Sequence, residues 1–195
     1  MRIIAGRYRS RVLEAPLGLS TRPTSDRLRE TLFNVLAPRL QGAAFVDLYA
    51  GSGAVGLEAL SRGAASVTFV ERAPAALKAL RANLAQLGIG SGFRIQPGSV
   101  ASFLRKAMET SPGPIAYELV FLDPPYEAER EYEVTLGLLG GAAAAVLTPG
   151  AVVIAEHRRK EPLEERYGAL ERTRLLEQGD AALSFYALGT DRRRT

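Results

Sequence analysis

The chain has 195 residues, 47% of them hydrophobic, with a mean hydropathy of -0.01 and a formal net charge of +4. Its length fits one globular domain, and no apolar stretch is long enough to span a membrane, so we expect a cytoplasmic protein without membrane contact. The chain has no cysteine, which excludes disulfides, thiolate nucleophiles and cysteine-based zinc sites, and its single histidine excludes a site of clustered histidine ligands. Any catalysis must therefore use carboxylates, backbone dipoles and a bound cofactor.

The first 29 residues are strongly basic. They contain seven arginines and two acidic residues, a net charge of +5, which exceeds the charge of the whole chain. The alternation over residues 2–14 predicts a short hairpin. It carries Tyr8 among three arginines, namely Arg7, Arg9 and Arg11. Guanidinium groups bind phosphates and an aromatic ring stacks on bases, so we interpret the segment as a nucleic-acid arm, the alternative being a solvated basic hairpin.

A helix is predicted from about residue 26 to 36, capped by Thr24 or Ser25 and stopped by Pro38. Residues 1–43 therefore form an N-terminal extension to the domain that follows. The short tail from residue 191 to 195 is expected to be disordered.

From Ala44 onward, strand and helix patterns alternate, which predicts a parallel sheet covered on both faces within residues 44–190. Strands are expected near 44–49, 66–71, 93–97, 117–122 and 151–156, and helices near 53–62, 74–87, 99–109 and 130–139. Residues 168–176 and 181–188 read as two adjacent strands joined by Gln178-Gly179-Asp180. They predict an antiparallel pair at one edge of the sheet.

A glycine-rich loop, Gly51-Ser52-Gly53-Ala54-Val55-Gly56, follows the first of these strands. Asp47 precedes it, and Glu71 ends the next strand, 20 residues beyond Gly51. The spacing also fits a nicotinamide dinucleotide, but Asp47 would then repel the pyrophosphate by about 1–4 kcal/mol. S-adenosylmethionine has no phosphate, and its ammonium and sulfonium favour a carboxylate. It is the predicted cofactor, and Glu71 is predicted to bind its ribose hydroxyls. The alternative is a tight glycine turn that binds no ligand.

The sequence Asp123-Pro124-Pro125-Tyr126 ends the apolar run 119–122. Asp123 and the carbonyl of Pro124 can accept both hydrogens of an exocyclic amine, while Tyr126 offers a stacking face. This pattern favours an amine methyltransferase over a plain acidic Pro-Pro turn. His157, just past the fifth strand, is a less favoured candidate for a proton relay than for an ordinary strand-end residue.

Three segments carry a resemblance to a known family. They are Arg2-Ile3-Ile4-Ala5-Gly6-Arg7-Tyr8-Arg9, the block from Arg22 to Asn34 that begins Arg22-Pro23-Thr24-Ser25, and Ala50 to Gly63. Together with the Asp-Pro-Pro-Tyr motif they resemble the RsmD family of bacterial 16S ribosomal RNA guanine-N2 methyltransferases, which are class I S-adenosylmethionine-dependent enzymes. The match runs in order from residue 2 to about 188.

The resemblance implies a Rossmann-like, doubly wound α/β sheet of seven strands. It implies an enzyme that methylates one guanine of 16S rRNA in the small subunit or an assembly intermediate. We expect this enzyme to be a monomer. The implied catalytic residues are Asp123, Pro124 and Tyr126. The implied cofactor residues are Asp47, Tyr49, Gly51, Ser52, Gly53, Glu71, Arg72, Ser99, Val100 and Asp123. The implied RNA-binding residues are Arg7, Tyr8, Arg9, Arg11, Arg22 and Thr24.

One departure from the family pattern concerns adenine. Relatives often have Asp or Asn after the third strand, where this chain has Gly98-Ser99-Val100, so a hydroxyl or backbone groups must hold the adenine amine.

Three other functions share some of these features. A DNA amine methyltransferase usually brings a separate target-recognition domain, for which residues 1–43 leave little space. A protein glutamine methyltransferase would gain nothing from an arginine-dense arm. A non-catalytic RNA-binding module would not explain why Asp47, Glu71 and Asp123 all lie at strand ends.

Overall fold

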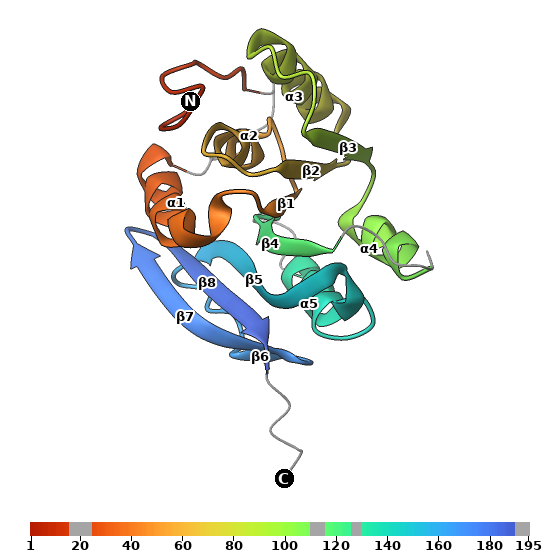
Figure 1. The fold of residues 1–195 in the computed structure, drawn as a ribbon. Helices are drawn as coiled ribbons and strands as arrows, with labels where there is room; N and C mark the ends of the chain where they lie inside the picture. Colours follow the sequence, from red (N-terminus) through yellow and green to blue (C-terminus); the bar gives the residue numbers. More distant parts are fainter. Residues whose placement is uncertain (16–24, 110–115, 126–129, 190–195) are drawn as a thin grey trace.

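A single eight-stranded sheet with helices on both faces organises the protein (Figure 1). The computed structural model describes residues 1–15, 25–109, 116–125 and 130–189. The strands are β1 (Ala44–Leu48), β2 (Ser66–Glu71), β3 (Phe93–Pro97), β4 (Tyr117–Leu122), β5 (Leu147–Arg158), β6 (Arg166–Tyr167), β7 (Leu170–Gln178) and β8 (Ala181–Leu188). The helices are α1 (Asp26–Leu40), α2 (Ala54–Ser61), α3 (Pro74–Gln86), α4 (Val100–Glu109), α5 (Arg130–Leu139) and the 3-10 turn η1 (Ala144–Val146).

The strand order is β3-β2-β1-β4-β5-β8-β7-β6, and β1 to β5 run parallel. The chain moves outward from β1 to β3 and then returns to place β4 on the other side of β1. In the register of that pair, Asp47 is opposite Phe121 and Leu48 is opposite Leu122. The loops that follow β1 and β4 therefore leave the sheet side by side, at the switch point where doubly wound folds bind ligands.

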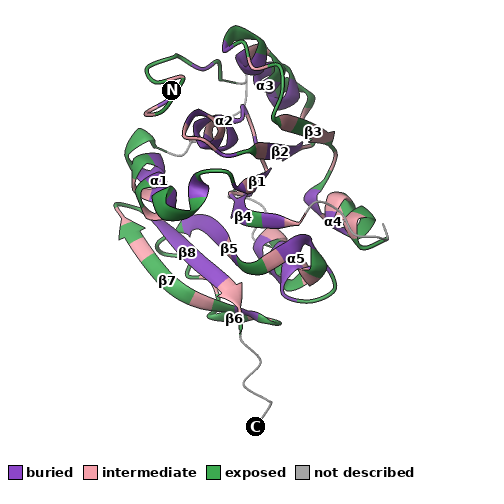
Figure 2. Ribbon diagram, in the orientation of Figure 1, coloured by how far each residue is buried: buried purple, intermediate pink, exposed green. Residues whose placement is uncertain are grey.

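Alternate residues of the central strands fill two separate cores. Phe45, Phe69 and Phe121 pack with α1, α2 and α3 on one face, whereas Val46 and Val120 pack with α4 and α5 on the other. Figure 2 shows the central strands buried and the outer helix surfaces exposed. A sheet buried on both faces explains why residues of β1 and β2 are buried at consecutive positions and not only at alternate ones.

The predicted fold class is confirmed, and two details of the prediction are wrong. The sheet has eight strands because the two-residue β6 pairs with β7 beyond the expected edge. Helix α1 is not stopped by Pro38 but continues to Leu40. A proline in the last turn removes one helical hydrogen bond, and Leu36 and Leu40 are both buried, so packing keeps that turn helical.

The first 15 residues form a compact loop closed by one antiparallel bridge, Arg2 to Val12, rather than a regular two-stranded ladder. Ile3 N–H donates to the carbonyl of Arg11 at 2.9 Å, and Ser10 N–H donates to that of Ile3 at 2.9 Å. We call residues 1–15 the N-terminal segment. Its Ile3 and Leu13 are buried in the core that contains α1, α2 and α3.

None of the helices in the described part of the chain is long and apolar enough to cross a membrane.

Candidate active site

The glycine loop between β1 and α2 needs its glycines for two different reasons. Gly51 and Gly53 have φ angles of 56° and 85°, a region that L side chains rarely adopt. A side chain at Gly53 would also collide with Leu80 of α3, and one at Gly56 would collide with Phe69 of β2. Helix α2 therefore packs tightly on the sheet, with its N-terminal amides at the switch point.

Asp47 lies beneath this loop and is only 2% exposed. The backbone N–H of Gly56 donates to its Oδ2 at 2.9 Å. Burial raises the pKa of Asp47 to about 7, the Gly56 hydrogen bond opposes that rise, and nearby Glu71 adds to it. A buried carboxyl with a raised pKa is stabilised as the anion by a bound cation, so the site suits an ammonium or sulfonium and not a phosphate.

The raised pKa of Asp47 predicts a loss of stability with rising pH. Between about pH 4 and pH 7 Asp47 binds more protons in the folded protein than in the unfolded chain, so its contribution to the free energy of unfolding falls as pH rises through that window. We expect Asp47→Asn to exceed the wild type in stability at pH 8 by about 1–4 kcal/mol, and by much less at pH 4. Urea unfolding at the two pH values measures this difference; an equal effect at both would contradict it.

Glu71 ends β2 and holds the neighbouring loops. Its Oε2 accepts the N–H of Gly51 at 2.8 Å, and its Oε1 accepts those of Arg72 and Ala73, both at 2.7 Å. The side chain is half-buried, and Arg72 beside it is exposed. Oε1 already accepts two hydrogen bonds and Oε2 accepts one, so Glu71 can orient the loop and still accept from one ribose hydroxyl at Oε2.

Glu71→Ala is expected to weaken S-adenosylmethionine binding by about 1–3 kcal/mol, because charge-assisted hydrogen bonds to the ribose are lost. Calorimetry measures the change. NADH should show no saturable binding to the wild type, and tight NADH binding would contradict a methyltransferase site.

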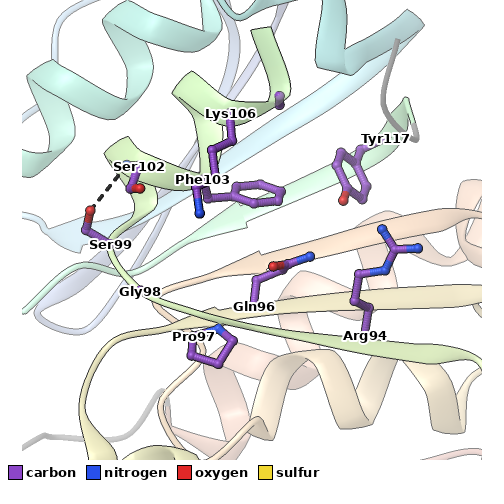
Figure 3. A pocket seen from close by; sticks show the side chains of 10 residues that line it. Arg94, Gln96, Pro97, Gly98, Ser99, Ser102, Phe103, Lys106 and Tyr117 are labelled. Carbon is purple, nitrogen blue, oxygen red and sulfur yellow. Dashed lines mark hydrogen bonds between the residues drawn. The ribbon is translucent and has the colours of Figure 1, made fainter. Parts of the chain in front are cut away.

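Ser99 has a structural contact that the sequence did not reveal. Its Oγ accepts the N–H of Ser102 at 3.2 Å, which caps the first turn of α4, and Val100 beside it is buried. Next to it lies a cavity of about 250 Å³ between β3 and α4 (Figure 3). Gln96 and Phe103 line this cavity from the two sides. The Ser99 hydroxyl can still donate its own proton to a ligand.

We expect Ser99→Ala to lower the free energy of unfolding by about 0.5–2 kcal/mol through loss of the cap, and to weaken the cofactor by under about 1 kcal/mol. Ser99→Asp is the matched variant, since aspartate also caps helices and adds a carboxylate for the adenine amine. It should keep the stability and tighten cofactor binding. Urea unfolding and calorimetry separate the two effects. A loss in Ser99→Ala as large as in Glu71→Ala would place adenine elsewhere.

Asp123 and Pro124 follow β4 directly. Asp123 is half-buried and Pro124 is buried, while Tyr126 lies outside the described residues. The pairing of Leu48 with Leu122 places Asp123 beside the start of the glycine loop. The two chain segments predicted to hold cofactor and amine are thus neighbours.

Tyr49, just before the glycine loop, is bonded to helix α5. It is one of the non-glycine residues with positive φ, at 66°. Its hydroxyl lies 2.8 Å from Oε2 of Glu131 and 2.7 Å from Oγ1 of Thr135, both on α5, the helix that follows the Asp123 turn. Burial raises the pKa of Tyr49, so the phenol stays protonated and donates to Glu131. Sequence reasoning missed Glu131 and Thr135, although their four-residue spacing on one helix face was a signal.

His157 is 2% exposed and bonded through both ring nitrogens. Nδ1 lies 3.0 Å from the carbonyl of Arg158 and 3.1 Å from that of Glu161, so Nδ1 must carry the proton. Nε2 then accepts from the hydroxyl of Ser184 at 2.9 Å. Burial lowers the pKa of His157, and these contacts suit a structural role in the sheet.

The arginines of the N-terminal segment face solvent. Arg7, Arg9 and Arg11 are exposed, and the guanidinium carbon of Arg7 lies 5.5 Å from the ring centroid of half-buried Tyr8. The predicted RNA-binding residues Arg22 and Thr24 lie outside the described residues.

Arg29 belongs to the basic stretch by sequence but not to its surface. It is fully buried, bonded to the carbonyl of Arg2 and, at 3.0 Å, to Asp26. Burial lowers its pKa against the opposing effect of Glu58. The net charge of +5 counted over residues 1–29 therefore overstates the positive charge that this stretch exposes to a partner.

Comparisons with known proteins identify the family of this chain. The family described as "Conserved hypothetical protein 95" matches residues 1–187. A putative rRNA methyltransferase, YlbH, of Bacillus subtilis is 34% identical over 186 residues, covering 95% of this chain and 98% of its own. The ribosomal RNA small subunit methyltransferase D of Escherichia coli is 46% identical over 139 residues, covering 71% of this chain and 66% of its own.

Solved structures show the same fold. A putative methyltransferase, yhhF, from Escherichia coli superposes with a TM-score of 0.81 at 35% identity, covering 95% of this chain and 96% of its own. The hypothetical protein TTHA0928 of Thermus thermophilus superposes with a TM-score of 0.76 at 30% identity, covering 95% and 98%.

Proposed function

This chain belongs to the RsmD family of ribosomal RNA methyltransferases, and from that premise we propose that it methylates the exocyclic N2 amine of one guanine in 16S rRNA with S-adenosylmethionine. The observation that carries the proposal is the adjacency of the ends of β1 and β4, which brings the glycine loop beside Asp123. The substrate in this proposal is 16S rRNA within the small subunit or an assembly intermediate, met by a monomer in the cytoplasm.

Two parts of the chain take different tasks in this proposal. Residues 1–43 contact RNA, and residues 44–190 form the methyltransferase domain. The exposed arginines of the N-terminal segment support the first assignment, since they offer phosphate contacts.

The residues at the loop fit the proposed cofactor. The buried carboxyl of Asp47 suits its ammonium, Glu71 suits the ribose hydroxyls, and the amides at the start of α2 suit its carboxylate. Ser99 and Val100 flank the position proposed for adenine. Bound there, S-adenosylmethionine supplies an electrophilic methyl group on a positively charged sulfur.

The chain's own contribution to the chemistry is placement of the amine. Asp123 and the carbonyl of Pro124 accept its two hydrogens, which draws the nitrogen lone pair out of conjugation. The nitrogen–carbon bond then forms as the carbon–sulfur bond breaks, and one amine proton leaves to water or Asp123. Moving the guanine out of its stack costs a few kcal/mol, least in an unpaired loop. Orientation and placed charge provide most of the acceleration.

Mass spectrometry of ribosomal RNA nucleosides from cells with and without the gene tests this function. We expect one N2-methylguanosine of 16S rRNA to disappear with the gene and to return on complementation. An unchanged nucleoside profile would contradict it, as would loss of a methylated adenine instead.

A further inference from the structure

Asn83 of α3 is a fully buried polar residue that touches both the N-terminal segment and the glycine loop. Its Oδ1 accepts the N–H of Glu14 at 2.7 Å. Its Nδ2 donates to the carbonyl of Glu14 at 3.1 Å and to the carbonyl of Ser52 at 3.0 Å. One side chain thus joins two loops that are 38 residues apart in the sequence.

The three partners fix the orientation of the carboxamide. Glu14 N–H is a donor and needs the oxygen, whereas the two carbonyls need the two hydrogens of the nitrogen. Aspartate would keep the bond to Glu14 N–H but would set a carboxylate against two carbonyls. An apolar residue would leave three backbone groups without this partner. Each of them that stays buried would lower the free energy of unfolding by about 1–3 kcal/mol.

The contact with Ser52 bears on the geometry of the proposed cofactor site. It fixes the peptide plane between Ser52 and Gly53, and the N–H of Gly53 on that plane donates to the carbonyl of Ala50 at 2.7 Å. Helix α2 starts immediately after this plane. Asn83 therefore helps to set the direction of the N-terminal amides of α2.

The other end of the N-terminal segment is fastened to the same helix. Glu58 of α2 accepts the N–H groups of Ile4 and Ala5 at 2.7 and 3.0 Å. The carbonyl of Ser61 accepts the N–H of Arg7 at 2.7 Å. A side chain at Gly6 would collide with that carbonyl. The segment with the exposed arginines is thus held at α2 near its start and, through Asn83, at the glycine loop near its end.

We propose that Asn83 is a positioning residue that couples occupation of the glycine loop to the order of the N-terminal segment. A ligand that holds the loop holds the carbonyl of Ser52, and with it the amide that anchors Glu14. Because coupling between two sites is reciprocal, a partner that holds the segment raises cofactor affinity by the same factor. The assignment of these two sites to cofactor and RNA rests on the proposed function.

Hydrogen exchange of the full chain with and without S-adenosylhomocysteine, in the absence of RNA, tests the coupling. In the wild type the ligand should slow exchange in residues 49–57 and also in residues 1–15. Asn83→Asp should bind S-adenosylhomocysteine more weakly. At saturation the ligand should still slow exchange in residues 49–57 of this variant, but not in residues 1–15. Gln86→Ala is the matched control on the same helix, because the side chain of Gln86 bonds the N-terminal segment, at the carbonyl of Val12 (3.3 Å), and not the glycine loop. In this variant the ligand should still slow exchange in both the loop and the segment.

A second variant changes the N-terminal segment at Glu14 and leaves Asn83 and helix α3 unchanged. Glu14→Pro removes the N–H that Asn83 accepts but not the bond between Asn83 and Ser52. It should keep ligand protection of the loop and reduce protection of the segment, because only the bond from Nδ2 of Asn83 to the carbonyl of residue 14 remains. Protection of the loop alone in the wild type would overturn the coupling, as would a normal segment response in both variants. Absence of any binding to the wild type would instead contradict the proposed function.

Discussion

Asp123→Ala is expected to lower the rate of methyl transfer by at least about 100-fold while leaving cofactor affinity nearly unchanged. The physical reason is that Asp123 lies at the end of β4, across from the glycine loop; of the two roles that the family resemblance implies for it, contact with the amine and contact with the cofactor, we propose the first. Removing one placed hydrogen-bonding group from a reaction centre costs about 100- to 1000-fold in other enzymes. Single-turnover transfer and calorimetry on the same preparation measure the two quantities.

Asp123→Asn is the matched variant for this prediction. Its amide oxygen can accept one amine hydrogen, so it should retain more activity than Asp123→Ala with the same cofactor affinity. If both variants lose cofactor binding in parallel with activity, Asp123 supports the site as a whole and does not act on the amine.

Replacing Arg7, Arg9 and Arg11 together with alanine is expected to raise the apparent substrate constant by roughly 50-fold near 0.15 M salt. Each exposed arginine that contacts a phosphate releases about one counterion, so the salt dependence should also flatten by up to about three units of slope. Cofactor affinity should not change in the absence of RNA. Transfer to ribosomal particles at several salt concentrations measures the constant and the slope.

A control with the same loss of charge uses arginines far from the N-terminal segment. Arg105, Arg166 and Arg174 are exposed, and the elements that carry them, α4, β6 and β7, lie away from the N-terminal segment in Figure 1. Their joint replacement should change the substrate constant much less. Equal effects of the two triple variants would mean that net charge, and not the N-terminal segment, attracts the RNA.

Much of the fold could be predicted because the strands are buried on both faces. The mostly apolar strands β1, β2 and β4, followed by glycine, acid and Pro-Pro, identify the switch point from sequence alone. The short strand β6 could not be predicted, since two residues carry no periodicity. The end of α1 was misjudged because tertiary packing of Leu40 outweighs the missing N–H of Pro38.

The polar contacts inside the site were harder to predict than its location. Ser99 was expected to face a ligand, and its capping bond to Ser102 emerges only when α4 is in place. Arg29 counts as a surface cation in the sequence but is buried. Asn83 had a signal, as a polar residue on the apolar stripe of α3, yet its partners are 31 and 69 residues away. Such long-range pairs follow from topology and not from local pattern.

We propose that the protein methylates a guanine amine of small-subunit RNA at the switch point of its sheet. The most direct test of this proposal is transfer of tritium from labelled S-adenosylmethionine to unmodified 30S particles, naked 16S RNA and duplex DNA, followed by nucleoside analysis. A folded ribosomal domain offers shape as well as phosphates, so particles should be the better substrate and naked RNA a poor second. The account predicts label in N2-methylguanosine from the particles. Label in N6-methyladenine of DNA, or in protein glutamine, would contradict it.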